Sequence, residues 1–154
     1  MTLTEGDAAP DFALPASKAR HVSLQAMRGS PFVLYFYPKA DTPGCTKEAC
    51  AFQEALLQLG KIGVAVIGVS KDSIGAIDKF ANKYGLEFPL ASDETGETIR
   101  AYGAWVEKSM YGRKYMGVER ATFLIDNQGR IAKIWRAVKI TDHVSSVIYE
   151  AARL

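Results

Sequence analysis

The feature that most constrains this chain is the junction between a buried strand and an amphipathic helix at residues 32–59. Residues 32–37 form an unbroken apolar and aromatic run, which is typical of a central strand covered on both faces. Two prolines and a glycine follow, and residues of these types are typical of a loop between two secondary-structure elements. Apolar residues then recur at steps of four, three, four and three, at Cys45, Ala49, Phe52, Leu56 and Leu59. The sequence therefore predicts a strand, a short loop and a helix over 45–59.

Similar patterns predict the other elements of the chain. Extended segments are expected at 64–69, at 87–90, in a hairpin formed by 121–126 and 130–135, and as weak edge strands within 1–24. Helices are expected from Asp72 or Ser73 to Gly85, over 95–102, and after a cap at Thr141 or Asp142. Strands alternating with helices, followed by a hairpin, predict an α/β fold with a central mixed sheet and helices on both faces. Residues 1–154 are expected to form a single domain.

Composition excludes several classes of protein. A formal net charge of +2 is too small to indicate binding to nucleic acid or to an anionic membrane. No apolar stretch approaches the length of a membrane span, and the first residues lack the pattern of a signal peptide. Two cysteines are too few for a secreted disulfide scaffold. We therefore expect a cytoplasmic protein in which a cysteine pair is catalytic or redox-sensing rather than structural.

Cys45 is the residue with the strongest chemical signal. It lies at or near the first helical residue, where unpaired N–H groups and the positive end of the helix dipole favour the thiolate, which is the reactive form. The alternative is a small buried apolar residue on the helix stripe. Cys50 follows five residues later, and this spacing disfavours a dithiol of the C-x-x-C kind.

Other reactive side chains are few. His21 and His143, the only histidines, are far apart in the sequence, so a metal site is not expected and each is predicted to lie on the surface. The basic stretch around Lys108, Arg113 and Lys114 is interleaved with tyrosines, and we expect a solvated face there rather than an RNA-binding patch. The residues alone therefore indicate an α/β domain with a redox-active thiol.

Three ordered segments extend this interpretation, because they resemble the peroxiredoxin family. The pattern Pro38-x-x-x-Thr42-x-x-Cys45 is similar to the active-site motif of peroxiredoxins. Residues 6–12, with Ala9-Pro10-Asp11-Phe12, and residues 117–126, which include Arg120, resemble further family segments. Residues 107–117, together with Cys50, are similar to the Q type, also called bacterioferritin comigratory protein. The resemblance spans nearly the whole chain.

The resemblance implies a thioredoxin-like fold and thiol-dependent reduction of hydrogen peroxide and organic hydroperoxides. It implies that Cys45 is the peroxidatic cysteine, which becomes a sulfenic acid. It also implies that Cys50 resolves this acid as an intrachain disulfide, and that thioredoxin or a similar reductant restores both thiols. Some relatives carry the resolving cysteine on the next helix, but residues 73–84 contain none. No metal or organic cofactor is implied.

The same likeness assigns roles around the sulfur. Thr42 is expected to hydrogen-bond the thiolate and the peroxide, and Arg120 to stabilise the thiolate and the charge on the leaving oxygen. Pro38 is expected to stiffen the loop and shield the sulfur. The N–H groups of Gly44 and Cys45 would face an anionic oxygen. Glu48 is either a group that supports Arg120 or a first-turn carboxylate favoured by the helix dipole.

Two classes of function remain open at this point. The first is a monomeric peroxidase, and the alternative is a non-enzymatic binding or chaperone protein switched by the same disulfide. Catalytic turnover of peroxide would distinguish the first from the second.

Overall fold

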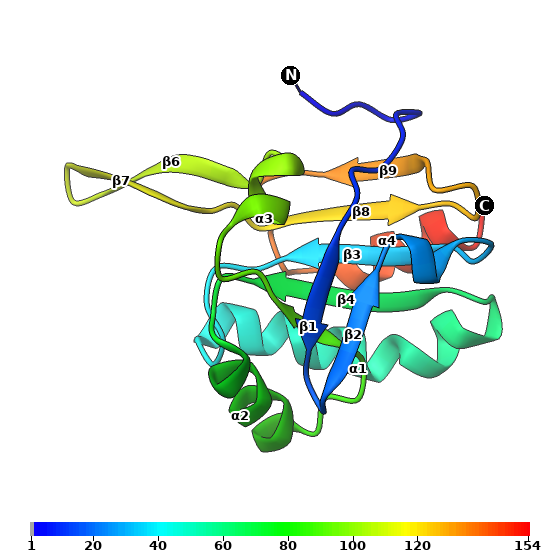
Figure 1. Cartoon of the computed structure of the whole chain (residues 1–154), viewed down its shortest axis with the longest axis horizontal. Helices are drawn as coiled ribbons and strands as arrows, with labels where there is room; N and C mark the ends of the chain where they lie inside the picture. The colour runs from blue at the N-terminus through cyan, green and yellow to red at the C-terminus, as the bar shows by residue number, and fades with distance from the viewer. Residues whose placement is uncertain (1) are drawn as a thin grey trace.

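The computed structural model describes residues 2–154. A seven-stranded mixed sheet has the order β2-β1-β5-β4-β3-β8-β9 (Figure 1). Its strands are β1 (Ala13–Ala16), β2 (Arg20–Ser23), β3 (Phe32–Phe36), β4 (Ala65–Ser70), β5 (Leu90–Ser92), β8 (Ala121–Ile125) and β9 (Ile131–Trp135). Strands β3, β4 and β5 are parallel to one another, β8 is antiparallel to β3, and β9 is antiparallel to β8. The predicted mixed sheet is therefore confirmed.

Helices cover both faces of this sheet. Val33, Tyr35 and Tyr37 point to the face packed by α1 (Pro43–Lys61), α2 (Ile74–Tyr84) and α4 (His143–Ala151). The alternate residues of β3 belong to a second core, covered by the short α3 (Glu97–Ala101) and the N-terminal segment. A 3₁₀ turn, η1 (Gln25–Met27), precedes β3. No helix within residues 2–154 is long and apolar enough to cross a bilayer.

Most predicted elements form where the patterns placed them. The hydroxyl of Ser73 accepts a hydrogen bond from the N–H of Ala76, and Gly85 ends α2 in the left-handed region, as expected from the cap residues. The helix predicted at 45–59 begins two residues earlier, because Pro43 occupies the first helical position. Asp142 precedes α4 as expected, but its side chain makes no capping hydrogen bond.

Three expectations were wrong or incomplete. The strand predicted at 87–90 lies at Leu90–Ser92, where the chain pairs with β4 and β1. The basic stretch forms an unpredicted hairpin, β6 (Trp105–Met110) and β7 (Arg113–Val118), which stands away from the body (Figure 1). His143, predicted on the surface, is only 5% exposed. Its ring packs edge-on against Phe52 and Trp135, and its Nε2 lies 2.8 Å from the hydroxyl of Thr122.

The loop between β3 and α1 is tied to its neighbours at two points. The N–H of Ala40 donates to the carboxylate of Asp72, with a distance of 2.8 Å. Asp41 accepts from both Lys83 and Tyr84 of α2. These bonds hold the chain at the carboxyl edge of the sheet, where α1 begins.

Gly68 creates the space in which Tyr35 lies. The two residues are partners in the parallel β3–β4 ladder, and Tyr35 stacks on Phe52 of α1 with ring centroids 4.7 Å apart. A Cβ at position 68 would lie 2.8 Å from both Tyr35 Cζ and Leu90 Cδ2. The absence of a side chain there allows α1 to approach the sheet closely.

We predict that Gly68→Ala lowers the free energy of unfolding by about 2 kcal/mol, because the core around Tyr35 cannot yield without strain. Gly75→Ala is the control, since a Cβ at that helical position meets nothing within 4 Å. It should raise the free energy of unfolding by about 0.5–1 kcal/mol. Urea denaturation measures both, and equal effects of the two substitutions would contradict the packing argument.

Candidate active site

Cys45 is the third residue of α1 and is 2% exposed. Thr42 precedes the helix in an extended conformation, and the N–H of Thr46 makes the first helical hydrogen bond, to the carbonyl of Thr42 at 2.8 Å. The N–H groups of Gly44 and Cys45 come before this bond and so stand outside the helical ladder. The sulfur therefore lies at the positive end of the helix dipole, as the sequence indicated.

Arg120 joins Cys45 to Glu48. Its Nη2 donates to the sulfur of Cys45 at 3.3 Å, and its Nη1 donates to Oε1 of Glu48 at 2.7 Å. Cys45 and Glu48 are three residues apart on α1 and thus share a face of the helix. Their partner Arg120 follows β7 in the sequence, 75 positions from Cys45. A permanent cation and a thiol are therefore held in direct contact, with little solvent around them.

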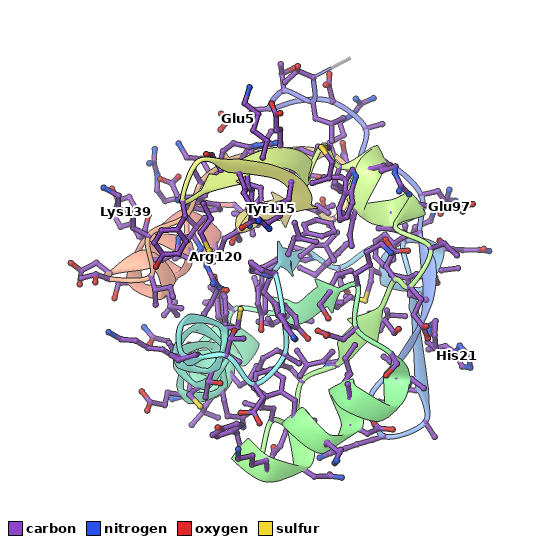
Figure 2. All side chains as sticks on the ribbon, turned by 90° about the vertical axis from the view of Figure 1, so that its left-hand side faces the viewer. Glu5, His21, Glu97, Tyr115, Arg120 and Lys139 are labelled. Carbon is purple, nitrogen blue, oxygen red and sulfur yellow. The ribbon has the colours of Figure 1, made fainter. Side chains whose placement is uncertain are left out.

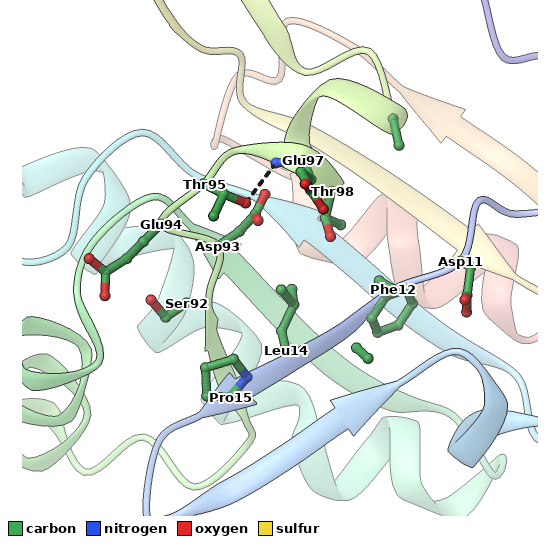
Figure 3. A pocket seen from close by; sticks show the side chains of 12 residues that line it. Asp11, Phe12, Leu14, Pro15, Ser92, Asp93, Glu94, Thr95, Glu97 and Thr98 are labelled. Atoms are coloured by element: carbon green, nitrogen blue, oxygen red, sulfur yellow. Dashed lines mark hydrogen bonds between the residues drawn. The ribbon is translucent and has the colours of Figure 1, made fainter.

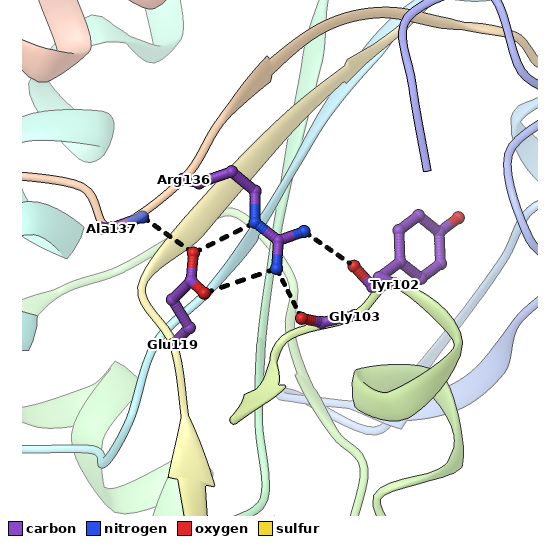
Figure 4. Close-up of polar contacts among 5 residues, drawn as sticks. All are labelled: Tyr102, Gly103, Glu119, Arg136 and Ala137. Carbon is purple, nitrogen blue, oxygen red and sulfur yellow. Dashed lines mark hydrogen bonds and ion pairs between the residues drawn. The ribbon is translucent and has the colours of Figure 1, made fainter. Parts of the chain in front are cut away.

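The backbone around Arg120 is fixed from two sides. The N–H of Glu119 donates to the carbonyl of Ala104 at 2.7 Å, and the carbonyl of Arg120 accepts from Val138 at 2.9 Å. The Glu119 carboxylate also accepts from Arg136 and from the N–H of Ala137, as Figure 4 shows. The guanidinium of Arg136 further donates to the carbonyl groups of residues 102 and 103.

Gly44 lets Arg120 approach the start of the helix. A Cβ at position 44 would lie 3.3 Å from Nη2 of Arg120 and 3.3 Å from Cδ1 of Ile140. Any larger residue would therefore press on the guanidinium nitrogen that contacts the sulfur. Gly44, for which the resemblance implies a role in substrate binding, thus has a packing role in the structure.

Glu48 is fully buried, with an exposure of 0%. Burial raises the pKa of Glu48 to about 7, although the charge and hydrogen bond of Arg120 act in the opposite direction. Burial also raises the pKa of Tyr35 well above its usual value, and the charge of Glu48 adds to that shift. Glu48 therefore titrates in the neutral range, and it does so in contact with Arg120, the cation that also contacts the sulfur of Cys45.

Thr42 and Pro38 lie in the loop before α1, and both are half-buried. The Thr42 hydroxyl donates to the carbonyl of Lys39 at 2.7 Å. Its proton is committed to that bond, so the oxygen can accept from a bound hydroperoxide but cannot at the same time donate to the thiolate. Pro38 follows the buried Tyr37 and has no N–H that would need a partner.

Cys50 lies in the same unbroken helix as Cys45, and both are free thiols. Cys50 lies outside the apolar stripe predicted for this helix, yet its side chain is half-buried and packs against the core between the sheet and the helices. The apolar stripe read from the sequence is thus too narrow, since positions 50 and 51 also border that core.

His143 and Lys108 are two residues near the site that sequence reasoning missed. Burial lowers the pKa of His143 to about 4, and the charge of Arg120 adds to this shift. Burial and Arg120 also lower the pKa of Lys108, whereas Cys45 opposes the change, so this amine lies within electrostatic reach of the site. Their positions depend on contacts between distant segments, and only the apolar pattern of α4 hinted at burial of His143.

A separate cleft of about 640 Å³ lies between β1 and the loop from β5 to α3 (Figure 3). Its lining includes Asp11, Asp93 and Glu94, and none of the residues around Cys45. Nothing in its chemistry connects it with a redox thiol. Among residues 2–154, no group of three or more histidine, cysteine or acidic side chains could hold a metal ion.

The chain resembles known proteins in sequence and in fold. The model of the AhpC/TSA family matches residues 5–134. A Coxiella burnetii protein named as a peroxiredoxin Bcp is 47% identical over 148 residues, which cover 96% of this chain and 98% of that protein. The chain belongs to the peroxiredoxin family, in its Q type.

Solved structures of the Q type show the same fold. A cysteine-to-serine mutant of PrxQ from Xylella fastidiosa has a TM-score of 0.94 and 35% identity, covering 99% of this chain and 98% of that one. Bacterioferritin comigratory protein from Xanthomonas campestris, described as having alkyl peroxide reduction activity, has a TM-score of 0.88 and 38% identity. Its match covers 92% of this chain and 90% of that one. The predicted thioredoxin-like fold is confirmed, and the chain is an enzyme, a thiol peroxidase.

We predict that the charge of Glu48 shapes the pH dependence of the first oxidation step. Above pH 7 the carboxylate forms and offsets part of the Arg120 charge at the sulfur, while below pH 7 it is protonated. Glu48→Gln keeps an acceptor for Arg120 but cannot ionise. Its rate constant with hydrogen peroxide should match the parent near pH 6 and exceed it roughly three- to tenfold above pH 8. Stopped-flow fluorescence measures this ratio.

Glu54→Gln is the matched control, because Glu54 is an exposed carboxylate on the same helix. It should leave the ratio near one at every pH. A constant ratio for Glu48→Gln over the same range would show that ionisation of Glu48 does not reach the thiol.

Proposed function

We propose that this peroxiredoxin reduces hydrogen peroxide and organic hydroperoxides with Cys45 as the peroxidatic residue. The observation that carries the proposal is the 3.3 Å contact between Arg120 and the buried sulfur at the start of α1. The cation and the helix terminus together favour a thiolate, which is the nucleophilic form. The alkyl peroxide reduction described for the Xanthomonas campestris relative supports organic hydroperoxides as substrates.

In the first step the thiolate attacks the terminal oxygen of the hydroperoxide. A sulfur–oxygen bond forms, the O–O bond breaks, and the leaving alkoxide or hydroxide takes a proton to become an alcohol or water. Arg120 and the N–H groups of Gly44 and Cys45 would stabilise the charge on the peroxide oxygens. The Thr42 oxygen would accept a hydrogen bond from the O–H of the hydroperoxide, and Pro38 would keep water from the sulfur. Glu48 would hold Arg120 in position.

In the second step Cys50 attacks the sulfenic acid, so that a disulfide forms and water leaves. Residues five apart on a helix differ by about 140° in direction and about 7.5 Å in rise, which puts their Cα atoms roughly 8.7 Å apart. A disulfide requires a Cα separation below about 7 Å. The helix must therefore unwind around Cys45 and Cys50 before the second step, and this opening would limit its rate.

In the third step a dithiol reductant, thioredoxin or a similar protein, supplies two electrons and two protons and becomes a disulfide itself.

We further propose that residues 1–154 act as one domain and as a monomer in the cytoplasm. The activity would need no nucleic acid, membrane or cofactor. The single sheet that joins strands from residue 13 to residue 135 supports one domain. The reducing cytoplasm would supply the dithiol.

Cys45→Ser should abolish peroxide turnover, because an alcohol without a dedicated base is a poor nucleophile. Cys50→Ser should react with one equivalent of peroxide and then stop at the sulfenic acid or at a higher oxidation state. Peroxide consumption, thiol counting and intact mass measure these outcomes. Full turnover by Cys45→Ser would refute the assignment, while one-time oxidation of the parent without turnover would favour a redox-switched binding protein.

Oxidation should expose the backbone of the first turns of α1 and leave the central sheet unchanged. The amides from Thr46 to about Phe52 should lose hydrogen-exchange protection when the disulfide forms, because it cannot close in a helix. The amides of β4 are the internal control and should stay protected. Equal protection of α1 in both redox states would contradict an intrachain Cys45–Cys50 disulfide and would indicate a bond between chains.

A further inference from the structure

The hairpin of β6 and β7, residues 105–118, forms an arm with an unusual surface. Residues 2–154 have eight exposed large apolar side chains, and four of them lie on this arm, at Met110, Tyr111, Tyr115 and Met116. Tyr111, at the tip, is 98% exposed. Isolated apolar residues on a surface are normal, but a cluster on one protruding element indicates an interaction site.

The arm also carries the charge imbalance of the protein. The chain has 19 basic and 17 acidic side chains. Three of the basic ones, Lys108, Arg113 and Lys114, and one acidic one, Glu107, belong to the arm, which leaves 16 of each elsewhere. The arm is therefore a cationic and apolar surface on an otherwise balanced molecule, and it suits a partner with acidic groups around an apolar patch.

One face of the arm combines basic and apolar side chains. Cross-strand partners share a face, so Lys108 and Tyr115 lie together, as do Met110 and Arg113. A Cβ at Gly117 would lie 3.3 Å from Cδ of Lys108, so the aliphatic stem of this lysine lies over the glycine. Its amine is within electrostatic reach of Arg120 and Cys45.

The base of the arm is continuous with the catalytic site. Val118 ends β7, and Arg120 follows two residues later. In Figure 2, where the arm points to the viewer, Tyr115 and Arg120 appear on the same side of the molecule. The bonds of Glu119 to Ala104 and Arg136 hold this connection rigid. A partner on the arm would thus stand beside the thiols of α1.

We propose that the arm is the docking surface for the protein dithiol that reduces the Cys45–Cys50 disulfide, a partner with acidic side chains around an apolar active surface. The inference rests on the proposed function. Each turnover transfers two electrons and two protons from the partner's two thiols to the disulfide, through one mixed disulfide. The partner must therefore bring its thiol to α1, and the arm offers it contact area that a small thiol would not need.

The test compares a protein reductant with a small one. Arg113→Glu/Lys114→Glu reverses two exposed charges of the arm, and Tyr111→Ser removes its exposed aromatic ring. With a bacterial thioredoxin, recycled by its reductase and NADPH, the charge reversal should raise the KM for thioredoxin roughly tenfold at low salt and much less at high salt. Tyr111→Ser should raise it roughly threefold at either salt concentration. Turnover driven by dithiothreitol should stay unchanged.

The control variant is Lys18→Glu/Arg28→Glu, which makes the same change of charge at two exposed positions outside the arm. It should leave the KM for thioredoxin unchanged. Calorimetric titration with a thioredoxin in which both cysteines are replaced by serine measures the dissociation constant independently of activity. The arm variants should weaken this binding, and the control variant should not.

Several results would overturn the proposal. Unchanged KM and binding in the arm variants would do so, as would equal losses in the arm and control variants. Co-sedimentation of the parent with phosphatidylglycerol vesicles, lost in the arm variants while the KM for thioredoxin stays constant, would assign the arm to a membrane surface instead. Absence of peroxide turnover with dithiothreitol in the parent would refute the proposed function separately, while the binding experiment would still decide on the arm.

Discussion

The site depends on one shared cation. Arg120 donates to the sulfur of Cys45 with one nitrogen and to the carboxylate of Glu48 with another. Removing a thiolate and a carboxylate from water costs free energy that a single exposed ion pair could not offset. The guanidinium meets both with its planar set of donors, which the compact amine of a lysine could not do. The rest of the fold serves to bring these three side chains together.

Two parts of the molecule meet at this cation. Cys45 comes from the first turn and Glu48 from the second turn of a helix whose apolar stripe packs on the sheet, and Gly68 lets that helix lie close to the strands. Arg120 comes from the turn between β7 and β8, held by Glu119 and Arg136. The first part is an amphipathic helix, which the proposed cycle requires to open locally. The second part is a network of hydrogen bonds among loops. Because these bonds do not involve α1, the network is not expected to move with the helix.

The sequence allowed good prediction wherever local pattern decides structure. The strand at 32–36, the helix after it, the Ser73 and Gly85 caps and the hairpin around residue 128 follow from periodicity and turn chemistry alone. The contact of Cys45 with Arg120 was expected only from family resemblance, since 75 positions separate the two residues. Burial of His143 and the pairing of β6 with β7 depend on packing between distant segments. Partial burial of Cys50 likewise depends on such packing, because its side chain borders the core between the sheet and the helices.

The attachment of Arg120 has a consequence for the return half of the cycle. Its carbonyl accepts from the N–H of Val138, the N–H of the preceding Glu119 donates to Ala104, and neither partner belongs to α1. In the proposed cycle the helix opens while the cation keeps its place at the edge of the sheet. Reduction of the proposed disulfide would then return the thiolate to a counter-charge that is already in position, and the first turn of α1 would re-form beside it. Recovery of the reactive state would involve only a few residues, and the rest of the fold would stay unchanged between turnovers.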